Sequence, residues 1–277
     1  MTIEKPIIVP FLKWAGGKRW LVHKHDQIFP KKYNRYIEPF LGGGSVFFHL
    51  QPKKSLLGDS NKHLIITYKA IKKDHKKLVK LLSHHNKKHS DDYYYKIRSE
   101  KYEDIIKQAA QFIYLNRTCF NGIYRVNQFG EFNVPRGSKD AVFLETDDFE
   151  ALSKMLQRAT LLSCDFEELI DKADEGDLIF ADPPYTVRHN LNGFIKYNEK
   201  LFSWSDQIRL SKALKRARKR GAQIICTNAN HESVRDLYSG KFFTLETVSR
   251  YSSIAAATDS RNQYEELLAT TKNLRTQ

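Results

Sequence analysis

The sequence predicts an α/β protein built on a doubly wound sheet, with a helical segment inserted into it. Three observations lead to this prediction. Between Arg35 and Asp59 the chain reads as a strand, a glycine turn, a helix and a second strand that ends in an acid. Beyond residue 157, short apolar strands alternate with a helix again. The segment from about Ser60 to Leu156 has helical periodicity and lies inside this α/β pattern, so it is an insertion rather than a tandem domain.

Each expected strand is a short apolar run that stops at a polar or turn residue. The strands are expected at 35–40, 55–57, 160–164, 177–181 and 223–227, with a final pair at 242–248 and 264–270. A helix is expected over 205–220, with Ser205 as its cap and Gly221 as its end. The resulting division is one domain from 1–60 and 157–277 and an inserted helical domain, 61–156, with a hairpin near 116–137.

The composition favours a polyanionic partner. The 277 residues include 46 basic and 32 acidic side chains, a formal net charge of +14, which points to nucleic acid first and an anionic membrane surface second. The sequence contains no run of ~18 apolar residues, so no membrane span is expected. The N-terminal segment does not have the pattern of a signal peptide. Three distant cysteines, Cys119, Cys164 and Cys226, exclude a disulfide framework and suit a reducing compartment.

Several polar groups follow the expected strands, where open α/β sheets bind ligands. Gly42 and Gly44 form a tight turn, and Asp59 follows 17 residues after Gly42, close to the spacing at which an acid binds a ribose. This pattern predicts a cofactor that carries a nucleoside. It departs from GxGxxG, which counts against a dinucleotide.

Two other motifs suggest ligand sites but lack the residues that such sites need. The GGK at 16–18 is no phosphate-binding loop, because Phe11 replaces the first glycine and Arg19 replaces the magnesium-binding Ser or Thr. His84, His85 and His89 have no neighbouring cysteine or metal-binding motif, so no metal is expected there.

The segment Asp177–Tyr185, DLIFADPPY, is the most specific feature. Its apolar strand stops at Asp182, and Pro183 and Pro184 forbid further ladder pairing and stiffen the backbone. A carboxylate and a rigid carbonyl at this point suit the binding of an exocyclic amine, and the ring of Tyr185 suits stacking on a base. A base inside a duplex cannot reach such a site unless it is flipped out.

Taken together, these segments resemble the Dam-type DNA adenine methyltransferases. FLKWAGGKRW (11–20) resembles that family's opening motif, YIEPFLGGGSVF (36–47) its cofactor loop, and LLGDSN (56–61) its ribose-binding acid. LNRTCFNGIYRVNQFGEFNVPRG (115–137) is similar to its target-recognition hairpin, and DLIFADPPY to its catalytic motif. The resemblance covers nearly the whole chain in the family's motif order.

The resemblance implies a Rossmann-like S-adenosylmethionine-dependent methyltransferase fold, a mixed seven-stranded sheet with an inserted helical target-recognition domain. It implies direct in-line methyl transfer to the amine of a flipped adenine, leaving S-adenosylhomocysteine, with no covalent intermediate and no metal. The implied catalytic residues are Asp182, Pro183, Pro184 and Tyr185. The implied cofactor-binding residues are Trp14, Lys18, Pro39, Phe40, Gly42, Gly44, Asp59, Asp165, Phe166 and Asp182.

The implied DNA-binding residues lie in the opening segment and the hairpin: Lys13, Phe120, Asn121, Ile123, Arg125, Pro135 and Arg136. An arginine can bind guanine bidentately, so Arg125 supports the family's common target, GATC. Phe120 stands where the family often has tyrosine, and Arg136 and Ser138 depart from the family's commoner pattern. The implied setting is double-stranded DNA at the nucleoid, in the cytoplasm of a bacterial or phage-infected cell. A monomer is expected, possible partners include a cognate restriction endonuclease, and no membrane is involved.

Two alternatives remain at this point. One is a methyltransferase acting on protein glutamine, although such enzymes usually have Asn where this chain has Asp182. The other is a catalytically inactive DNA-binding relative, against which the intact DPPY and Asp59 argue. The long segment 188–203 predicts that recognition of the bases flanking the target differs from the family's pattern.

Overall fold

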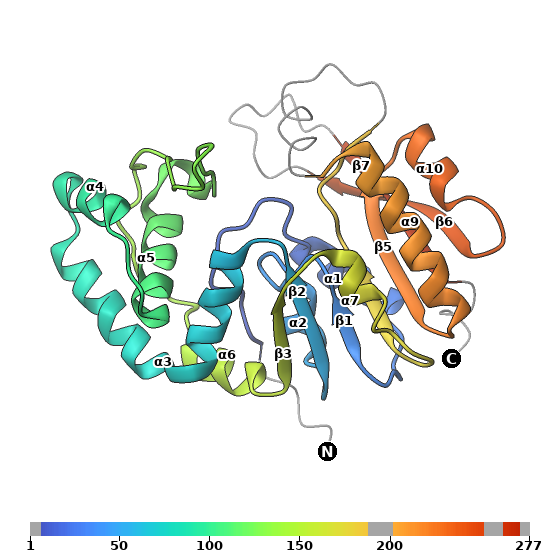
Figure 1. Cartoon of the computed structure of the whole chain (residues 1–277), viewed down its shortest axis with the longest axis horizontal. Helices are drawn as coiled ribbons and strands as arrows, with labels where there is room; N and C mark the ends of the chain where they lie inside the picture. The colour runs from blue at the N-terminus through green and yellow to red at the C-terminus, as the bar shows by residue number, and fades with distance from the viewer. Residues whose placement is uncertain (1–6, 188–201, 252–262, 272–277) are drawn as a thin grey trace. The chain divides into compact units, whose positions relative to one another are not determined.

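The structure is a computed structural model that describes residues 7–187, 202–251 and 263–271 (Figure 1). Most of the segment 188–203, expected to affect flanking recognition, therefore lies outside the described residues. The chain forms two compact units, each built from several stretches of sequence. The first comprises 1–22, 41–53 and 59–163, and the second comprises 23–40, 54–58 and 164–277. The predicted division at 61–156 remains a prediction.

The strands form a mixed seven-stranded sheet of order β3-β2-β1-β4-β5-β7-β6. Their bounds are β1 (Tyr36–Glu38), β2 (Ser55–Asp59), β3 (Ala159–Ser163), β4 (Leu178–Ala181), β5 (Gln223–Ala229), β6 (Phe243–Tyr251) and β7 (Gln263–Thr271). Within the second unit β1 is parallel to β2 and β4, and β4 to β5, while β7 runs antiparallel to β5 and β6. The sheet confirms the predicted fold class. All residues of β1 and β4 are buried, as expected for parallel strands inside a sheet.

Helices make up most of the first unit. They are α2 (Ser45–Leu50), α3 (Lys62–Lys88), α4 (Asp91–Ser99), α5 (Ile105–Thr118) and α6 (Phe149–Leu156). A short α1 (Arg19–Lys24) and the turn η1 (Asp26–Ile28) lie where the chain passes from the first unit to the second, and η2 (Phe120–Gly122) follows α5. The longer helices begin at capping side chains that accept a backbone N–H, namely those of Asn61, Ser90, Asp104 and Asp148.

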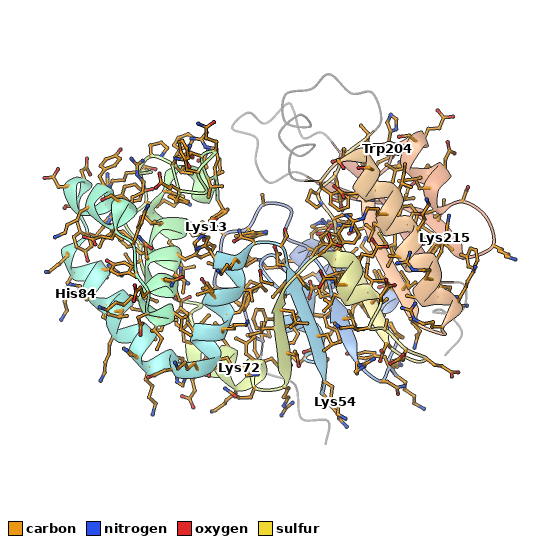
Figure 2. All side chains as sticks on the ribbon, in the orientation of Figure 1. Lys13, Lys54, Lys72, His84, Trp204 and Lys215 are labelled. Atoms are coloured by element: carbon orange, nitrogen blue, oxygen red, sulfur yellow. The ribbon has the colours of Figure 1, made fainter. Side chains whose placement is uncertain are left out.

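The long helix α3 separates an apolar face from a charged one. Its apolar face, which includes Leu64, Ile71 and Leu78, is buried, and Figure 1 shows α3 packed beside α5. Most lysines of the run between Lys72 and Lys88 are exposed, and Figure 2 shows His84 pointing outward from the helix. The run is therefore largely a solvated helix face, as its composition predicts.

The second unit contains α7 (Phe166–Ile170), α9 (Trp204–Lys219) and α10 (Glu232–Tyr238). Figure 1 shows α9 alongside β5, toward which it buries apolar residues such as Leu210 and Leu214. The predicted cap Ser205 is wrong. Ser203 has the extended backbone that a cap needs and forms a reciprocal capping box with Asp206, which leaves Ser205 inside the first turn. None of the described helices is long and apolar enough to cross a membrane.

Candidate functional site

The glycine turn between β1 and α2 is shaped by the close approach of a tryptophan. Gly42 and Gly44 have φ of 48° and 67°, in the left-handed region that favours glycine. A Cβ on Gly42 would lie 2.8 Å from the Cδ1 atom of Trp14, so only glycine leaves room for the indole. Trp14 is itself stacked on Tyr124 and Phe112, with ring centroids 5.8 Å and 6.4 Å away. The turn and the tryptophan therefore form one packed unit.

Asp59, at the end of β2, is tied to this turn. Its Oδ2 accepts the Gly42 N–H at 3.0 Å, and its Oδ1 accepts the Asn61 N–H at 2.9 Å. Burial raises the pKa of the Asp59 carboxyl, while these two backbone hydrogen bonds oppose that rise. A carboxylate has about four acceptor positions. Each oxygen can therefore accept one further hydrogen bond, which suits the two neighbouring hydroxyls of a ribose.

Tyr68 of α3 also supports the turn, a role that the sequence alone does not predict. Its hydroxyl donates to the Gly42 carbonyl at 2.9 Å, and the side chain is fully buried. Lys18 is also buried, and its Nζ donates to the Gly16 carbonyl at 2.9 Å. Helical spacing identifies Tyr68 as buried, but no local signal shows which backbone group its hydroxyl would bind.

In the second unit, the DPPY segment leaves the carboxyl end of β4 and is held by side chains of other strands. Thr227 of β5 donates from Oγ1 to Asp182 Oδ1 at 2.7 Å. The Tyr185 hydroxyl donates to Glu266 Oε2 of β7, also at 2.7 Å. The pKa of Tyr185 is raised well above its usual value, mainly by burial and then by the nearby carboxylates of Asp182 and Glu266. The phenol therefore remains a protonated hydrogen-bond donor at neutral pH.

The backbone of the same segment contacts a buried amide pair. Gln207 Nε2 donates to the Pro184 carbonyl at 3.5 Å and to the Thr186 carbonyl at 3.3 Å. Asn228 Nδ2 donates to Gln207 Oε1 at 2.9 Å, which fixes the orientation of the Gln207 amide. Pro183 is buried and Pro184 partly so. The motif is thus fixed through both its side chains and its backbone.

The residues expected near a cofactor adenine form an aromatic cluster in the second unit. The rings of Phe40 and Phe166 are stacked with centroids 5.4 Å apart, and Pro39, the residue before Phe40, is buried. Asp165 caps α7 by accepting the Glu167 N–H at 2.9 Å. Arg209 of α9 donates to Asp165 Oδ1 at 2.8 Å, and its guanidinium lies 4.8 Å from the Phe166 ring centroid. The cluster suits a flat, polar-edged ring.

The hairpin residues expected to read DNA are exposed. Phe120 is 52% exposed and Ile123 45%, and Asn121 and Arg125 are also exposed. Antiparallel bridges join Cys119 to Arg136 and Val126 to Phe132. Across the hairpin, Arg125 Nε donates to Asn133 Oδ1 at 2.9 Å, which orients the guanidinium. These hairpin side chains are thus presented to solvent rather than buried.

The base of the hairpin is joined to the opening segment. Asn116 accepts the Lys13 N–H at 2.9 Å and donates to the Lys13 carbonyl at 2.8 Å. Lys13, labelled in Figure 2, donates from Nζ to the Arg117 carbonyl at 3.2 Å, and burial is the main cause that lowers its pKa. Pro135 is exposed, and its carbonyl accepts the Phe120 N–H at 2.9 Å.

Arg136 and the histidines have partners within the chain. Arg136 forms ion pairs with Asp91 and Asp140, so its charge is largely balanced before any DNA is bound. His85 shares a hydrogen bond with the Tyr93 hydroxyl at 2.9 Å, and His89 shares one with the Tyr114 hydroxyl at 2.7 Å. Within the residues that the structure describes, no group of three or more His, Cys, Asp or Glu side chains is arranged to hold a metal ion.

A family model of D12 class N6 adenine-specific DNA methyltransferases matches residues 14–254. This chain belongs to that family. The match contains the glycine turn, Asp59, the hairpin and DPPY, and it confirms the resemblance seen in the sequence. As a member of the D12 class, the chain is an adenine-specific DNA methyltransferase, and DNA is its substrate.

Individual relatives agree with this assignment over most of their length. The chain is 34% identical over 270 residues to the type II methyltransferase M1.LlaDCHI of Lactococcus lactis subsp. cremoris, covering 94% of each protein. It is 36% identical over 256 residues to the type II methyltransferase M.MjaIII of Methanocaldococcus jannaschii, covering 84% of this chain and 89% of the relative. The DNA adenine methylase of Haemophilus influenzae is 32% identical over 266 residues, with coverage of 94% and 92%.

Sequence reasoning missed two sets of supporting residues. Tyr68 supports the glycine turn in the first unit, and the residues that support DPPY and the aromatic cluster in the second unit are Gln207, Arg209, Thr227 and Glu266. The sequence does not distinguish Glu266 from the neighbouring Glu265, since both are acids in the final strand. Only the structure shows that Glu266 is 3% exposed. A buried acid needs a partner, but the sequence alone does not identify Tyr185 as that partner.

Proposed function

We propose that this D12 methyltransferase acts on an adenine flipped out of duplex DNA, within GATC, and uses S-adenosylmethionine as its methyl donor. The observation that carries the proposal is the DPPY segment at the end of β4, where Asp182 and Tyr185 are both fixed by hydrogen bonds of 2.7 Å. An amine acceptor and a stacking ring held this firmly suit positioning of a base. Positioning can supply a large part of a reaction barrier.

Each unit contains residues whose chemistry suits S-adenosylmethionine. In the first unit, Asp59 has acceptor capacity for two ribose hydroxyls, and Gly42 and Gly44 keep side chains away from the turn. In the second unit, Phe40 and Phe166 offer aromatic surface for an adenine ring. S-adenosylmethionine supplies an electrophilic methyl group on a sulfonium, and its transfer to the amine nitrogen gives S-adenosylhomocysteine and releases one proton.

The residues of the catalytic motif would act on the target amine. Asp182, whose Oδ1 accepts a hydrogen bond from Thr227, would accept a hydrogen bond from the amine, with the Pro183 carbonyl as a second acceptor. Two acceptors favour a tetrahedral nitrogen, whose lone pair is then available for attack. The carboxylate also stabilises the positive charge that develops on the nitrogen. Tyr185 would stack on the flipped ring, and no side chain would form a covalent intermediate.

The recognition of DNA would rest on the hairpin and the opening segment. Arg125 would bind a guanine of the target bidentately, while Phe120, Asn121 and Ile123 would contact neighbouring bases. Lys13 and Pro135 would contact the DNA near them. The net charge of +14 supports attraction to the phosphate backbone. For Arg136 we propose a smaller role, because Asp91 and Asp140 already balance its charge.

The wider setting follows from this reaction. We propose that 61–156 acts as the target-recognition domain and that the protein works as a monomer on nucleoid DNA of a bacterial or phage-infected cell. A cognate restriction endonuclease is a proposed partner, because two relatives are type II methyltransferases.

Mapping of methylated adenines tests the proposal directly. Purified protein and S-adenosylmethionine would be incubated with unmethylated genomic DNA, and every modified adenine located by sequencing. The expected result is N6-methyladenine at GATC and at no other motif. Modification at a different motif would refute the GATC assignment. Failure to modify any adenine, with labelled methyl recovered in protein instead, would refute the function as a whole.

A further inference from the structure

Glu266 is an unusual residue for its place in the sheet. It lies in β7, between β5 and β6, with Ala229 and Val248 as its strand neighbours. Only 3% of the residue is exposed. Burial of a carboxylate is costly unless hydrogen bonds compensate for it, and Glu266 accepts one from the Tyr185 hydroxyl at 2.7 Å.

Thr227 has a similar role one strand away. It is fully buried in β5, the strand between β4 and β7, and its hydroxyl donates to Asp182 Oδ1 at 2.7 Å. Asp182 and Tyr185 are therefore each held by a side chain from a different strand. A hydroxyl donating to a carboxylate at this distance is a strong, charge-assisted hydrogen bond.

We propose that Glu266 and Thr227 are positioning residues for methyl transfer: Glu266 fixes the ring of Tyr185, and Thr227 fixes the carboxylate of Asp182. The inference rests on the proposed function, in which Tyr185 stacks on the flipped adenine and Asp182 binds its amine. Neither Glu266 nor Thr227 needs to touch DNA or donor. Each acts by removing the freedom of one side chain to rotate away from the base.

The geometry predicts which substitutions preserve this role. Gln at position 266 keeps a carbonyl oxygen that can accept a hydrogen bond from the Tyr185 hydroxyl. Leu removes this acceptor, so the buried Tyr185 hydroxyl loses its hydrogen bond to residue 266. Ser at 227 keeps the hydroxyl, whereas Val keeps the shape and removes it. Loss of a hydrogen bond to a charged group predicts a rate reduction of roughly ten- to a hundredfold for Glu266→Leu and Thr227→Val. Glu266→Gln and Thr227→Ser should retain most of the wild-type rate.

The neighbouring Glu265 provides a matched control. It is an exposed glutamate in the same strand, and its carboxylate accepts a hydrogen bond from Asn230 Nδ2 at 2.8 Å. Glu265→Leu makes the same chemical change one residue away but leaves Tyr185 untouched. It should methylate DNA at the wild-type rate.

The decisive experiment is a double-mutant cycle between each positioning residue and its partner. Single-turnover methylation of a duplex with one target site would be measured for Glu266→Leu, Tyr185→Phe and the double variant, and for Thr227→Val with Asp182→Asn. The dissociation constants for duplex and S-adenosylmethionine would be measured alongside. Each single substitution should lower the methylation rate at unchanged affinities. Within each pair, the second substitution should lower the rate by less than a further threefold when the first is already present. The Glu266→Leu and Thr227→Val pair should lose less than the product of the two single effects, because Thr227 also interacts with the Tyr185 side chain and the four residues form one network.

A second readout separates positioning from general destabilisation. Fluorescence of 2-aminopurine at the target adenine reports how the flipped base is stacked, and it should differ from wild type for Glu266→Leu but not for Glu266→Gln or Glu265→Leu. Equal rate losses for Glu266→Leu in the wild-type and Tyr185→Phe backgrounds would overturn the inference. So would a Glu266→Gln variant as slow as Glu266→Leu. If wild-type protein methylates no adenine, the proposed function itself has failed, which is distinct from either result.

Discussion

The glycine turn and the recognition hairpin belong to the same unit but are built in opposite ways. At the turn, the Asp59 carboxylate and the Gly42 carbonyl are hydrogen-bonded within the chain, and the Trp14 indole fills the space beside Gly42. On the hairpin, apolar side chains remain in solvent, with Phe120 52% and Phe129 77% exposed. This difference fits the proposed roles, because a cofactor site formed before binding needs a packed turn and a DNA-reading surface needs exposed side chains.

The base of the hairpin is also more tightly packed than its tip. At the base, Asn116 and Lys13 form reciprocal hydrogen bonds, and a Cβ on Gly122 would lie 2.7 Å from the Lys13 Cδ atom. At the tip, a Cβ on Gly130 would meet nothing within 4 Å. Substitutions at the turn or the hairpin base should therefore affect folding, whereas substitution of an exposed side chain proposed to read a base, such as Arg125, should affect target choice.

The largest effect is expected from Gly42→Ala. The new methyl group would collide with Trp14 at 2.8 Å, in a residue with φ of 48°. Overpacking costs about 1–3 kcal/mol, and left-handed backbone costs a non-glycine residue about 1–2 kcal/mol. The free energy of unfolding, measured with urea, should fall by about 2–5 kcal/mol.

Gly130→Ala is the matched control for that experiment. It has the same unfavourable backbone, with φ of 78°, but open space around the new methyl group. Its loss should be limited to the backbone cost of about 1–2 kcal/mol. Equal losses for the two variants would contradict the claim that Trp14 packs on the turn.

A smaller and different effect is expected from Arg125→Ala. Its guanidinium is exposed and held by Asn133 rather than by the core, so the free energy of unfolding should barely change. Discrimination between GATC and duplexes with the guanine replaced should fall by about 1–3 kcal/mol. The measured quantity is the ratio of the methylation rate on the GATC duplex to the rate on the duplex with the guanine replaced. Gln128→Ala, on the same hairpin, is the control. An unchanged ratio would exclude Arg125 from base readout.

A pH dependence of stability is expected from His85, a buried side chain of α3. Burial, and then the neighbouring His84, lower the pKa of His85 to about 4, against 6.5 in the unfolded chain. The unfolded state therefore binds more protons between these values, so the free energy of unfolding decreases as pH falls from about 6.5 to about 4. His85→Gln should weaken this dependence, whereas the exposed His84→Gln should change it much less. Identical pH profiles for wild type and His85→Gln would contradict the assignment.

The sequence predicted much of this architecture because the relevant signals are local. Apolar runs located all seven strands, and the glycine turn and DPPY appeared where those strands end. The position of the α9 cap was wrong by two residues, since Ser203 and Ser205 are both good caps and only the backbone distinguishes them. Residues such as Thr227 and Glu266 could not be assigned, because their partners lie 45 and 81 residues away in the sequence.

Asp182→Ala tests the central claim of this account, that one carboxylate holds the target amine and does not hold the DNA. Methylation of a GATC duplex and the dissociation constant for the same duplex would be measured on each variant, with Asp236→Ala, an exposed acid of the same unit, as control. Asp182→Ala is expected to lose at least about a hundredfold in methylation rate and to keep its affinity for DNA within about threefold. Full methylation by Asp182→Ala would contradict the account.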